Sequence, residues 1–286
     1  MDSNPSPFFP PELEREIFET AAYHDPAMIY GLSLVCRRVH KWLDGMKYAT
    51  VTSLAIGGCP VHILLQAIQS GPRPPSFFHH HVRNLYLAGG RDWGPNNDDL
   101  GQVLSVCSGL RNLVLLLLDL HSLEPLLPAL AAIKPRRLVL VREPLLDPHT
   151  PLFASLTHLH VVSVPLRGPN YSLRLPSFLA QLPVLTHFAM GVIVFHRANA
   201  ALAKDILVQC QSLQALIFVT TADVKRFPSI DHDDTRFLLY QQAGHDDFIR
   251  GWVAETRGRD RPLGSCGRVY CQEEARGDSA TFPLLD

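Results

Sequence analysis

The sequence has no excess of charge of one sign and no long hydrophobic run. Its 26 basic and 27 acidic residues nearly cancel, so no dominant surface for nucleic acid or an anionic membrane is indicated. The densest apolar run, Leu113 to Leu118, stops at Asp119 and is too short to cross a bilayer. The opening MDSNPSPFFPPELE has no basic segment followed by an apolar one, so we expect no secretory signal. We therefore expect a cytoplasmic or nuclear protein that binds neither membrane nor nucleic acid.

Cysteine pairs and catalytic motifs are also missing. The six cysteines are scattered, and none forms a CxxC pair, so we expect free buried thiols rather than disulfides. The chain has no GxSxG elbow, no Walker loop and no HExxH. These absences predict a protein that is not an enzyme and that has no cofactor.

What the sequence does have is a repeated leucine frame, L-x-x-L-x-L. Six segments fit it, and a weaker seventh copy is VTSLAI, residues 51–56. The fourth position of the frame falls at residues 54, 85, 113, 138, 159, 188 and 216. The steps between these positions are 31, 28, 25, 21, 29 and 28 residues. Five of the six steps lie within the period of about 20–29 residues that is typical of leucine-rich repeats.

Each frame predicts a short strand, because alternate side chains of a strand share one face and Leu85 and Leu87 then enter one core. Residues 98–107, 122–133 and 198–210 have helical spacing between frames. Residues 71–76 predict a loop, and we also place His79, His80 and His81 in a loop. A single strand–helix unit cannot bury its apolar face, whereas a stack can. The sequence predicts an α/β fold in which a short N-terminal helical module precedes a leucine-rich-repeat-like solenoid with a parallel sheet.

The segment from Pro10 to Leu43 contains two amphipathic helical patterns, separated by His24 to Met28. The second pattern predicts one apolar face that includes Leu32, Val35 and Val39. About forty residues make a poor independent core, so this unit is expected to lean on another surface. Either a partner groove or the open end of the repeat stack would supply that surface.

This segment resembles the F-box. The likeness rests on Pro10-Pro11-Glu12-Leu13, on Ile17-Phe18 and on Leu32-Ser33-Leu34-Val35-Cys36-Arg37-Arg38-Val39, and it covers roughly residues 9–48. The whole order resembles F-box-like proteins that are common in mushroom-forming fungi. The resemblance implies a substrate-recognition subunit that docks on the adaptor subunit of a cullin–RING ubiquitin ligase and holds an unknown protein substrate on its repeats. The residues expected at the adaptor, or in the core beneath it, are Pro11, Leu13, Ile17, Phe18, Leu32, Val35 and Val39. The alternative is a leucine-rich-repeat scaffold that joins no ligase.

Stacked frames would align side chains in columns on the face opposite the leucines. The first column is polar and the next two are mostly apolar, a mixture typical of protein-binding surfaces. The alternative is that a helix or the C-terminal segment covers these columns. Histidines at this spacing are possible zinc ligands, but no carboxylate or thiol stands beside them in the columns, so partner contact is favoured and no metal is expected. The residues expected to touch a partner are Tyr86, Arg137, His158, His160 and His187.

The expected organisation has five parts. A disordered start, residues 1–8, precedes the F-box-like module at 9–50 and the repeats at 51–222. Residues 223–258 are expected to cap the far end with a strand around Arg236 to Tyr240 and a helix at 246–258. Residues 259–286, rich in Gly, Arg and acidic residues, are expected to be a disordered tail.

Overall fold

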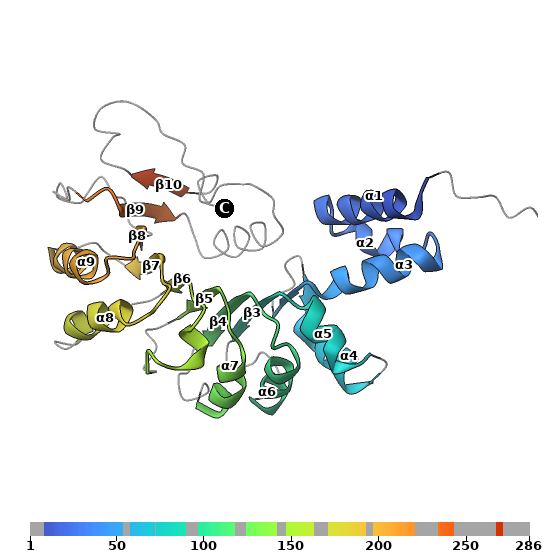
Figure 1. The fold of residues 1–286 in the computed structure, drawn as a ribbon, viewed down its shortest axis with the longest axis horizontal. Helices are drawn as coiled ribbons and strands as arrows, with labels where there is room; N and C mark the ends of the chain where they lie inside the picture. The colour runs from blue at the N-terminus through green and yellow to red at the C-terminus, as the bar shows by residue number, and fades with distance from the viewer. Residues whose placement is uncertain are drawn as a thin grey trace, which may run out of the picture.

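The computed structural model describes residues 9–53, 58–71, 73–89, 97–117, 124–141, 147–162, 171–192, 197–220, 234–242 and 267–270. The chain is an α/β protein with one ten-stranded sheet. In Figure 1 the strands form an inner arc and the later helices lie along its outer side, while the N-terminal helices stand at one end. Among the described residues, every helix is too short or too polar to span a membrane.

Three helices open the chain: α1 (Pro11–His24), α2 (Met28–Leu32) and α3 (Arg37–Asp44). Pro11 begins α1, where its fixed φ suits the first helical position, and Glu12 and Glu14 complement the helix dipole there. The buried side chains of these helices form a small cluster separate from that of the sheet: Ala22, Ile29, Val39 and Leu43.

The second amphipathic pattern is not one helix, as expected, but two. The Ser33 hydroxyl donates to the Ile29 carbonyl at 2.6 Å, and the backbone of Cys36 is extended before α3 begins. Hydroxyl groups that bond the preceding turn compete with continued helix, which accounts for the stop here. As a result Val35 stands in the connecting turn instead of on the buried face of a helix.

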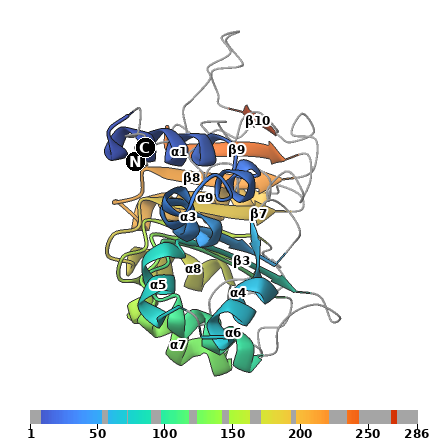
Figure 2. The same cartoon turned by 90° about the vertical axis from the view of Figure 1, so that its right-hand side faces the viewer.

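The strands are β1 (Thr50–Thr52), β2 (Cys59–Pro60), β3 (Asn84–Gly89), β4 (Asn112–Leu117), β5 (Arg137–Leu140), β6 (His158–Val161), β7 (His187–Val192), β8 (Ala215–Thr220), β9 (Phe237–Gln242) and β10 (Gly267–Tyr270). Their order is β10-β9-β8-β7-β6-β5-β4-β3-β1-β2. Strands β1 to β9 run parallel, and only β10 is antiparallel to its neighbour. Figure 2 shows β3, β7, β8 and β9 in succession along the molecule.

The register confirms the leucine ladder. Leu85 pairs with Leu113, Leu113 with Leu138 and Leu138 with Leu159, and the ladder continues through Phe188 and Leu216. All six side chains are at most 1% exposed and belong to one core. Helices on the outer side cover that core: α4 (Val61–Gln69), α5 (Pro75–His81), α6 (Asn97–Val106), α7 (Leu127–Ala132), α8 (Tyr171–Ala180) and α9 (Arg197–Gln209). The 3₁₀ turns are η1 (Gly45–Tyr48), η3 (Glu124–Leu126) and η4 (Pro151–Phe153).

Two details of the repeats differ from expectation. The weak first copy is out of register by three residues, because Val51, not Leu54, pairs with Leu85; Leu54 itself lies outside the described residues. The histidine run expected in a loop forms the last turn of α5, which begins at Pro75 with a proline at its first positions. Proline at the first helical position has its φ angle already set for a helix, which explains why the histidine run is helical rather than a loop.

A polar contact links the N-terminal helices to the first strand–helix unit. The Arg73 guanidinium binds the Asp44 carboxylate with two hydrogen bonds of 3.0 and 3.1 Å. The same guanidinium lies 5.2 Å from the ring centres of Tyr48 and of Phe77. Tyr48 is buried in the core of the sheet, so this contact ties the end of α3 to the first strand–helix unit.

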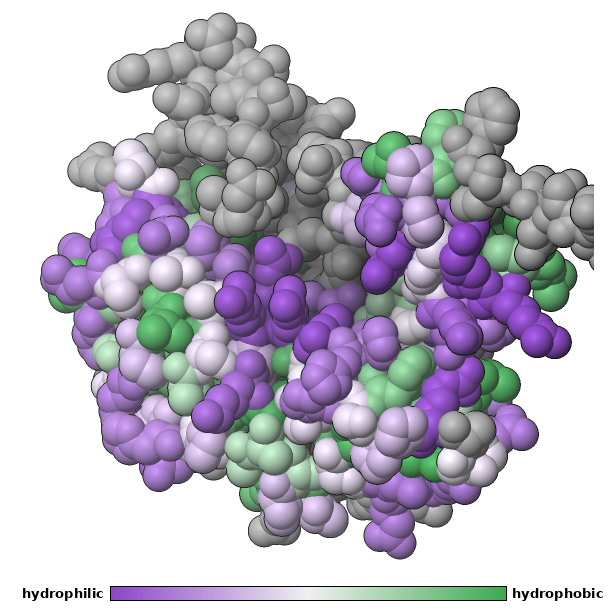
Figure 3. Space-filling model, turned by 45° about the vertical axis from the view of Figure 1, so that its right-hand side comes forward, coloured by the Kyte–Doolittle hydropathy of each residue, from purple (hydrophilic) through white to green (hydrophobic). Residues whose placement is uncertain are grey.

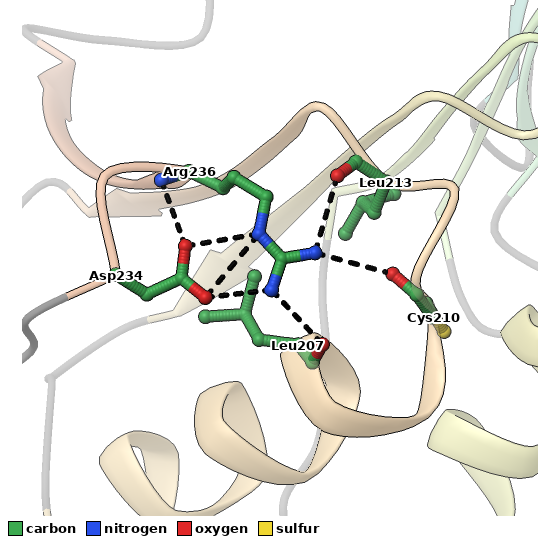
Figure 4. A network of polar contacts seen from close by, with 5 residues as sticks. All are labelled: Leu207, Cys210, Leu213, Asp234 and Arg236. Carbon is green, nitrogen blue, oxygen red and sulfur yellow. Dashed lines mark hydrogen bonds and ion pairs between the residues drawn. The ribbon is translucent and has the colours of Figure 1, made fainter.

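A second polar contact holds the last parallel strand. Arg236, just before β9, donates to the carbonyl oxygen of Leu207 at 3.0 Å, and at longer distances of 3.4 and 3.5 Å to those of Leu213 and Cys210 (Figure 4). These carbonyls end α9 and the turn after it, where free acceptors need a donor. Asp234 holds the guanidinium at 2.6 Å.

The strand expected around Arg236 to Tyr240 is present as β9. Beyond it, β10 pairs antiparallel with β9, so residues 267–270 are ordered as a strand within the segment expected to be a disordered tail. The helix expected at 246–258 lies outside the described residues, as do the starting segment 1–8 and the rest of the tail.

Candidate functional site: an apolar helical end and a polar strand edge

The N-terminal helices concentrate exposed apolar side chains. Eight large hydrophobic residues between positions 9 and 35 are exposed, against three in the rest of the described chain. Figure 3 shows hydrophobic patches among hydrophilic ones on the N-terminal side, at the upper right. A clustering of this kind is typical of protein interaction surfaces. The eight residues are Phe9, Leu13, Ile17, Tyr23, Met28, Tyr30, Leu34 and Val35.

The structure separates the seven predicted adaptor residues into two groups. Pro11 and Val35 are exposed, and so are Leu13 and Ile17, which are one helical turn apart on α1 at 49% and 53% exposure. The other three support the helices from within: Phe18 and Leu32 are half-buried against the small cluster, and Val39 is fully buried in it. The first group is available to a partner, whereas the second shapes the surface from below.

Sequence reasoning missed part of this surface. Met28, Tyr30 and Leu34 are exposed, Leu34 the most at 85%. For Leu34 the available signal is Ser33, whose hydroxyl bonds back to Ile29 at the end of α2 and leaves the next two residues in a turn. Across the same helices Arg38 of α3 pairs with Glu14 of α1 and lies 5.3 Å from the Trp42 ring, which fixes the two helices relative to one another.

The expected columns on the opposite face of the sheet exist. The first runs along the amino ends of the strands in a continuous register: Thr50, Asn84, Asn112, Arg137, His158, His187 and Ala215. At one end its amides bond across the strands. Asn112 Nδ2 donates to Asn84 Oδ1 at 2.6 Å, and Asn84 Nδ2 donates to Thr50 Oγ1 at 3.0 Å.

At the other end of this column two histidines stack. The rings of His158 and His187 are parallel within 4°, with centres 4.3 Å apart. Each ring places Nδ1 beside the hydroxyl of the threonine that precedes it, at 2.9 Å for Thr157 and 2.8 Å for Thr186. His187 is only 9% exposed, while His158 is half-buried.

These rings are uncharged near neutral pH. Burial, the neighbouring His187 ring and the charge of Arg137 lower the pKa of His158 to about 3. Burial and Arg137 also lower the pKa of His187, and burial lowers that of His160 to about 4. The described residues contain no group of three or more His, Cys, Asp or Glu side chains arranged to hold a metal ion.

The second column runs Tyr86, Val114, Val139, His160, Ala189 and Ile217, and only its first half is closed to solvent. Tyr86 and Val114 are 0% exposed and form a buried cluster with Leu116 and Val139. Tyr86, expected to touch a partner, is therefore inaccessible in this structure, whereas His160, Ala189 and Ile217 are half-buried. The half-buried polar positions on this face include Asn112, Arg137 and His158 of the first column and His160 of the second.

Three of the four cysteines in the described residues are buried. Burial raises the pKa of Cys59 to about 11, of Cys107 to about 12 and of Cys210 to about 11, so these groups stay protonated at neutral pH. They are free, as expected, but Cys36 is exposed rather than buried.

Neither the models of known protein families nor the curated protein sequences match this chain. Function is therefore inferred from the residues and their geometry.

Proposed function

We propose that this chain is a non-catalytic substrate-recognition subunit of the F-box type. Helices α1–α3 would dock on the adaptor of a cullin–RING ubiquitin ligase, and the repeats, as a leucine-rich solenoid, would hold a protein substrate. Such an assembly works in the cytoplasm or the nucleus. The observation that carries the proposal is the concentration of exposed apolar side chains on the segment that resembles the F-box.

Two further features support it. The ladder from Leu85 to Leu216 repeats at the spacing typical of leucine-rich repeats, whose faces commonly bind proteins. The Arg73–Asp44 contact holds the helical end against the first strand–helix unit. A receptor needs this rigidity, because the substrate must be presented at a constant position relative to the ligase.

Co-purification of the full chain with the purified adaptor tests the proposal. The double variant Leu13→Asp, Ile17→Asp places two charges at half-exposed positions of α1 without entering the core. If each side chain contributes about 1.4 kcal/mol to docking, the pair weakens binding on the order of 100-fold. The control is Val208→Asp, which places a charge at an apolar position of α9 that is 63% exposed and should leave binding unchanged.

The result that overturns the proposal is the absence of adaptor binding by the wild-type chain. Equal binding by wild type and the double variant would also overturn it. In either case the alternative stands: a leucine-rich-repeat scaffold that uses its sheet alone and joins no ligase.

A further inference from the structure

Three arginines, the arginine row, stand directly before three neighbouring strands of the sheet. Arg83 precedes β3, Arg111 precedes β4 and Arg136 precedes β5. The backbone fixes their register, because the Arg111 N–H donates to the Arg83 carbonyl and the Arg136 N–H donates to the Arg111 carbonyl, both at 2.8 Å. Each arginine lies two residues before a leucine of the ladder, so the row continues the leucine face to the amino edge of the sheet.

This edge carries positive charge without negative charge beside it in the sequence. Lys134 and Arg137 flank the row in the segment Lys-Pro-Arg-Arg at 134–137. The five residues that lead into each of the three strands, 79–83, 107–111 and 132–136, include no Asp or Glu. Acidic residues follow β3 and β4 instead, in the first turn of α6 and in η3. The near-neutral total of the chain therefore contains a local basic surface.

The fold itself uses one member of the row. The Arg83 guanidinium is half-buried and donates to the Gly109 carbonyl at 2.8 Å, in the turn after α6 where acceptors are left free. Arg111 and Arg136 are exposed, and within the described part of the chain their guanidinium groups make no hydrogen bond or ion pair. Burial and the charge of Arg111 lower the pKa of Arg83, so an anion at this edge would relieve a repulsion that the fold leaves in place.

We propose that Arg111 and Arg136, together with Lys134, form a binding surface for an acidic stretch of a partner polypeptide. The inference names the substrate class of the repeats, and so it rests on the proposed function. All three side chains are exposed and can be reached from solvent. A guanidinium forms paired hydrogen bonds with a carboxylate, and because its side chain is long it needs no fixed spacing along the bound chain.

The size and the surroundings of this surface favour a polypeptide over nucleic acid. Neighbouring strands are about 4.8 Å apart, so the row is about 10 Å long, the length of about three residues of an extended chain. Proteins that bind nucleic acid commonly contact about 6–10 phosphates. Helices α5, α6 and α7 end just before the three arginines, so they present carbonyls to this edge rather than the N–H groups that commonly bind phosphate.

Fluorescence anisotropy of a labelled hexaglutamate peptide, titrated with the full chain at low salt, tests the surface. The double variant Arg111→Gln, Arg136→Gln should bind about 5- to 10-fold more weakly, as expected when two exposed charge pairs are lost. Arg111→Lys, Arg136→Lys keeps the charge and should weaken binding less. The matched control Arg174→Gln, Lys204→Gln removes the same charge from exposed positions of α8 and α9 and should bind as wild type.

The proposal is overturned if the wild-type chain does not bind hexaglutamate, or if the control weakens binding as much as the arginine variant. Tighter binding of a hexathymidylate strand would also overturn it. So would tighter binding of a glycine–serine hexapeptide with one phosphoserine, because the surface would then select phosphate instead of a run of carboxylates. Both arginines are exposed, so the glutamine variant should unfold at the wild-type urea concentration.

Failure here is distinguishable from failure of the proposed function. The glutamine double variant leaves α1–α3 unchanged, so it should bind the adaptor as wild type does. Adaptor binding without hexaglutamate binding overturns the basic surface alone. Hexaglutamate binding without adaptor binding overturns the ligase proposal, and the surface then belongs to the alternative scaffold.

Discussion

The Arg73–Asp44 contact between the helical end and the sheet gives the most informative perturbation. Arg73→Met keeps much of the aliphatic length but removes two charge-assisted hydrogen bonds and the positive charge over two rings. The two side chains are 26% and 18% exposed, so solvent screens the pair only partly. Lys47 lies 3.6 Å from the same carboxylate and would keep it paired.

The magnitude follows from these contacts. A hydrogen-bonded pair of this kind, with the carboxylate still compensated, contributes about 1.5 kcal/mol, and each cation–ring contact about 0.5 kcal/mol. The expected loss of stability is therefore about 2–3 kcal/mol. Hydrogen exchange should show it as faster exchange in residues 37–48 and 75–81, while the strands from β5 to β8 keep their protection.

The matched control is Arg15→Met. Arg15 pairs with Glu19 at 2.7 Å on the surface of α1, at 57% and 35% exposure, and a pair of this kind contributes about 0.3–0.5 kcal/mol. The reasoning is refuted if the two variants cost the same, or if exchange after Arg73→Met rises equally throughout the sheet.

Three further predictions concern the sheet and its histidines. Leu138→Ala should lower the free energy of unfolding, measured with urea, by about 2–5 kcal/mol, because this side chain is only 1% exposed. Leu34→Ala should lower it by almost nothing, because Leu34 is 85% exposed. Similar losses in the two variants would contradict the ladder. Gly191→Ala should lower the free energy of unfolding by about 1–3 kcal/mol, because a Cβ there would lie 1.9 Å from the carbonyl oxygen of Val162, just after β6. Gly31→Ala meets open space, so it should be neutral or stabilising in the same assay. Lowering the pH from 7 to 5 should reduce the free energy of unfolding by about 2 kcal/mol through His158. The reason is that its pKa of about 3 in the folded protein lies below the unfolded value, so the unfolded chain binds the proton first. If His158→Phe leaves the stability equally dependent on pH, this prediction is contradicted.

The leucine ladder was predictable because a strand alternates its faces and a parallel stack repeats its register. Once Leu113 and Leu138 enter one core, the residues before and after them must point to the other face of the sheet. The first column was therefore predicted correctly. The first copy failed because β1 is only three residues long, with a buried valine between two threonines, and offers too little pattern to fix a register. Leu54 matched the frame by spacing alone.

The candidate site was less predictable. The spacing of Leu13 and Ile17 indicated an apolar face but not which side of it meets water, because that depends on how α1 packs against α3. The burial of Tyr86 depends on contacts across the sheet that no local pattern records. The threonine before each stacked histidine was visible as a repeated Thr-His pair, but the contact of its hydroxyl with Nδ1 depends on how each ring is turned.

The strand at the N-terminal edge of the sheet has a consequence for solubility. Strand β2 has two residues, and the second is Pro60, which carries no backbone N–H. A parallel sheet with a long free margin would recruit strands from other molecules, and such short, proline-ended margins are a known protection against this. Replacing Pro60 would restore a backbone N–H at this margin and so remove one of its two protections, leaving only the shortness of β2.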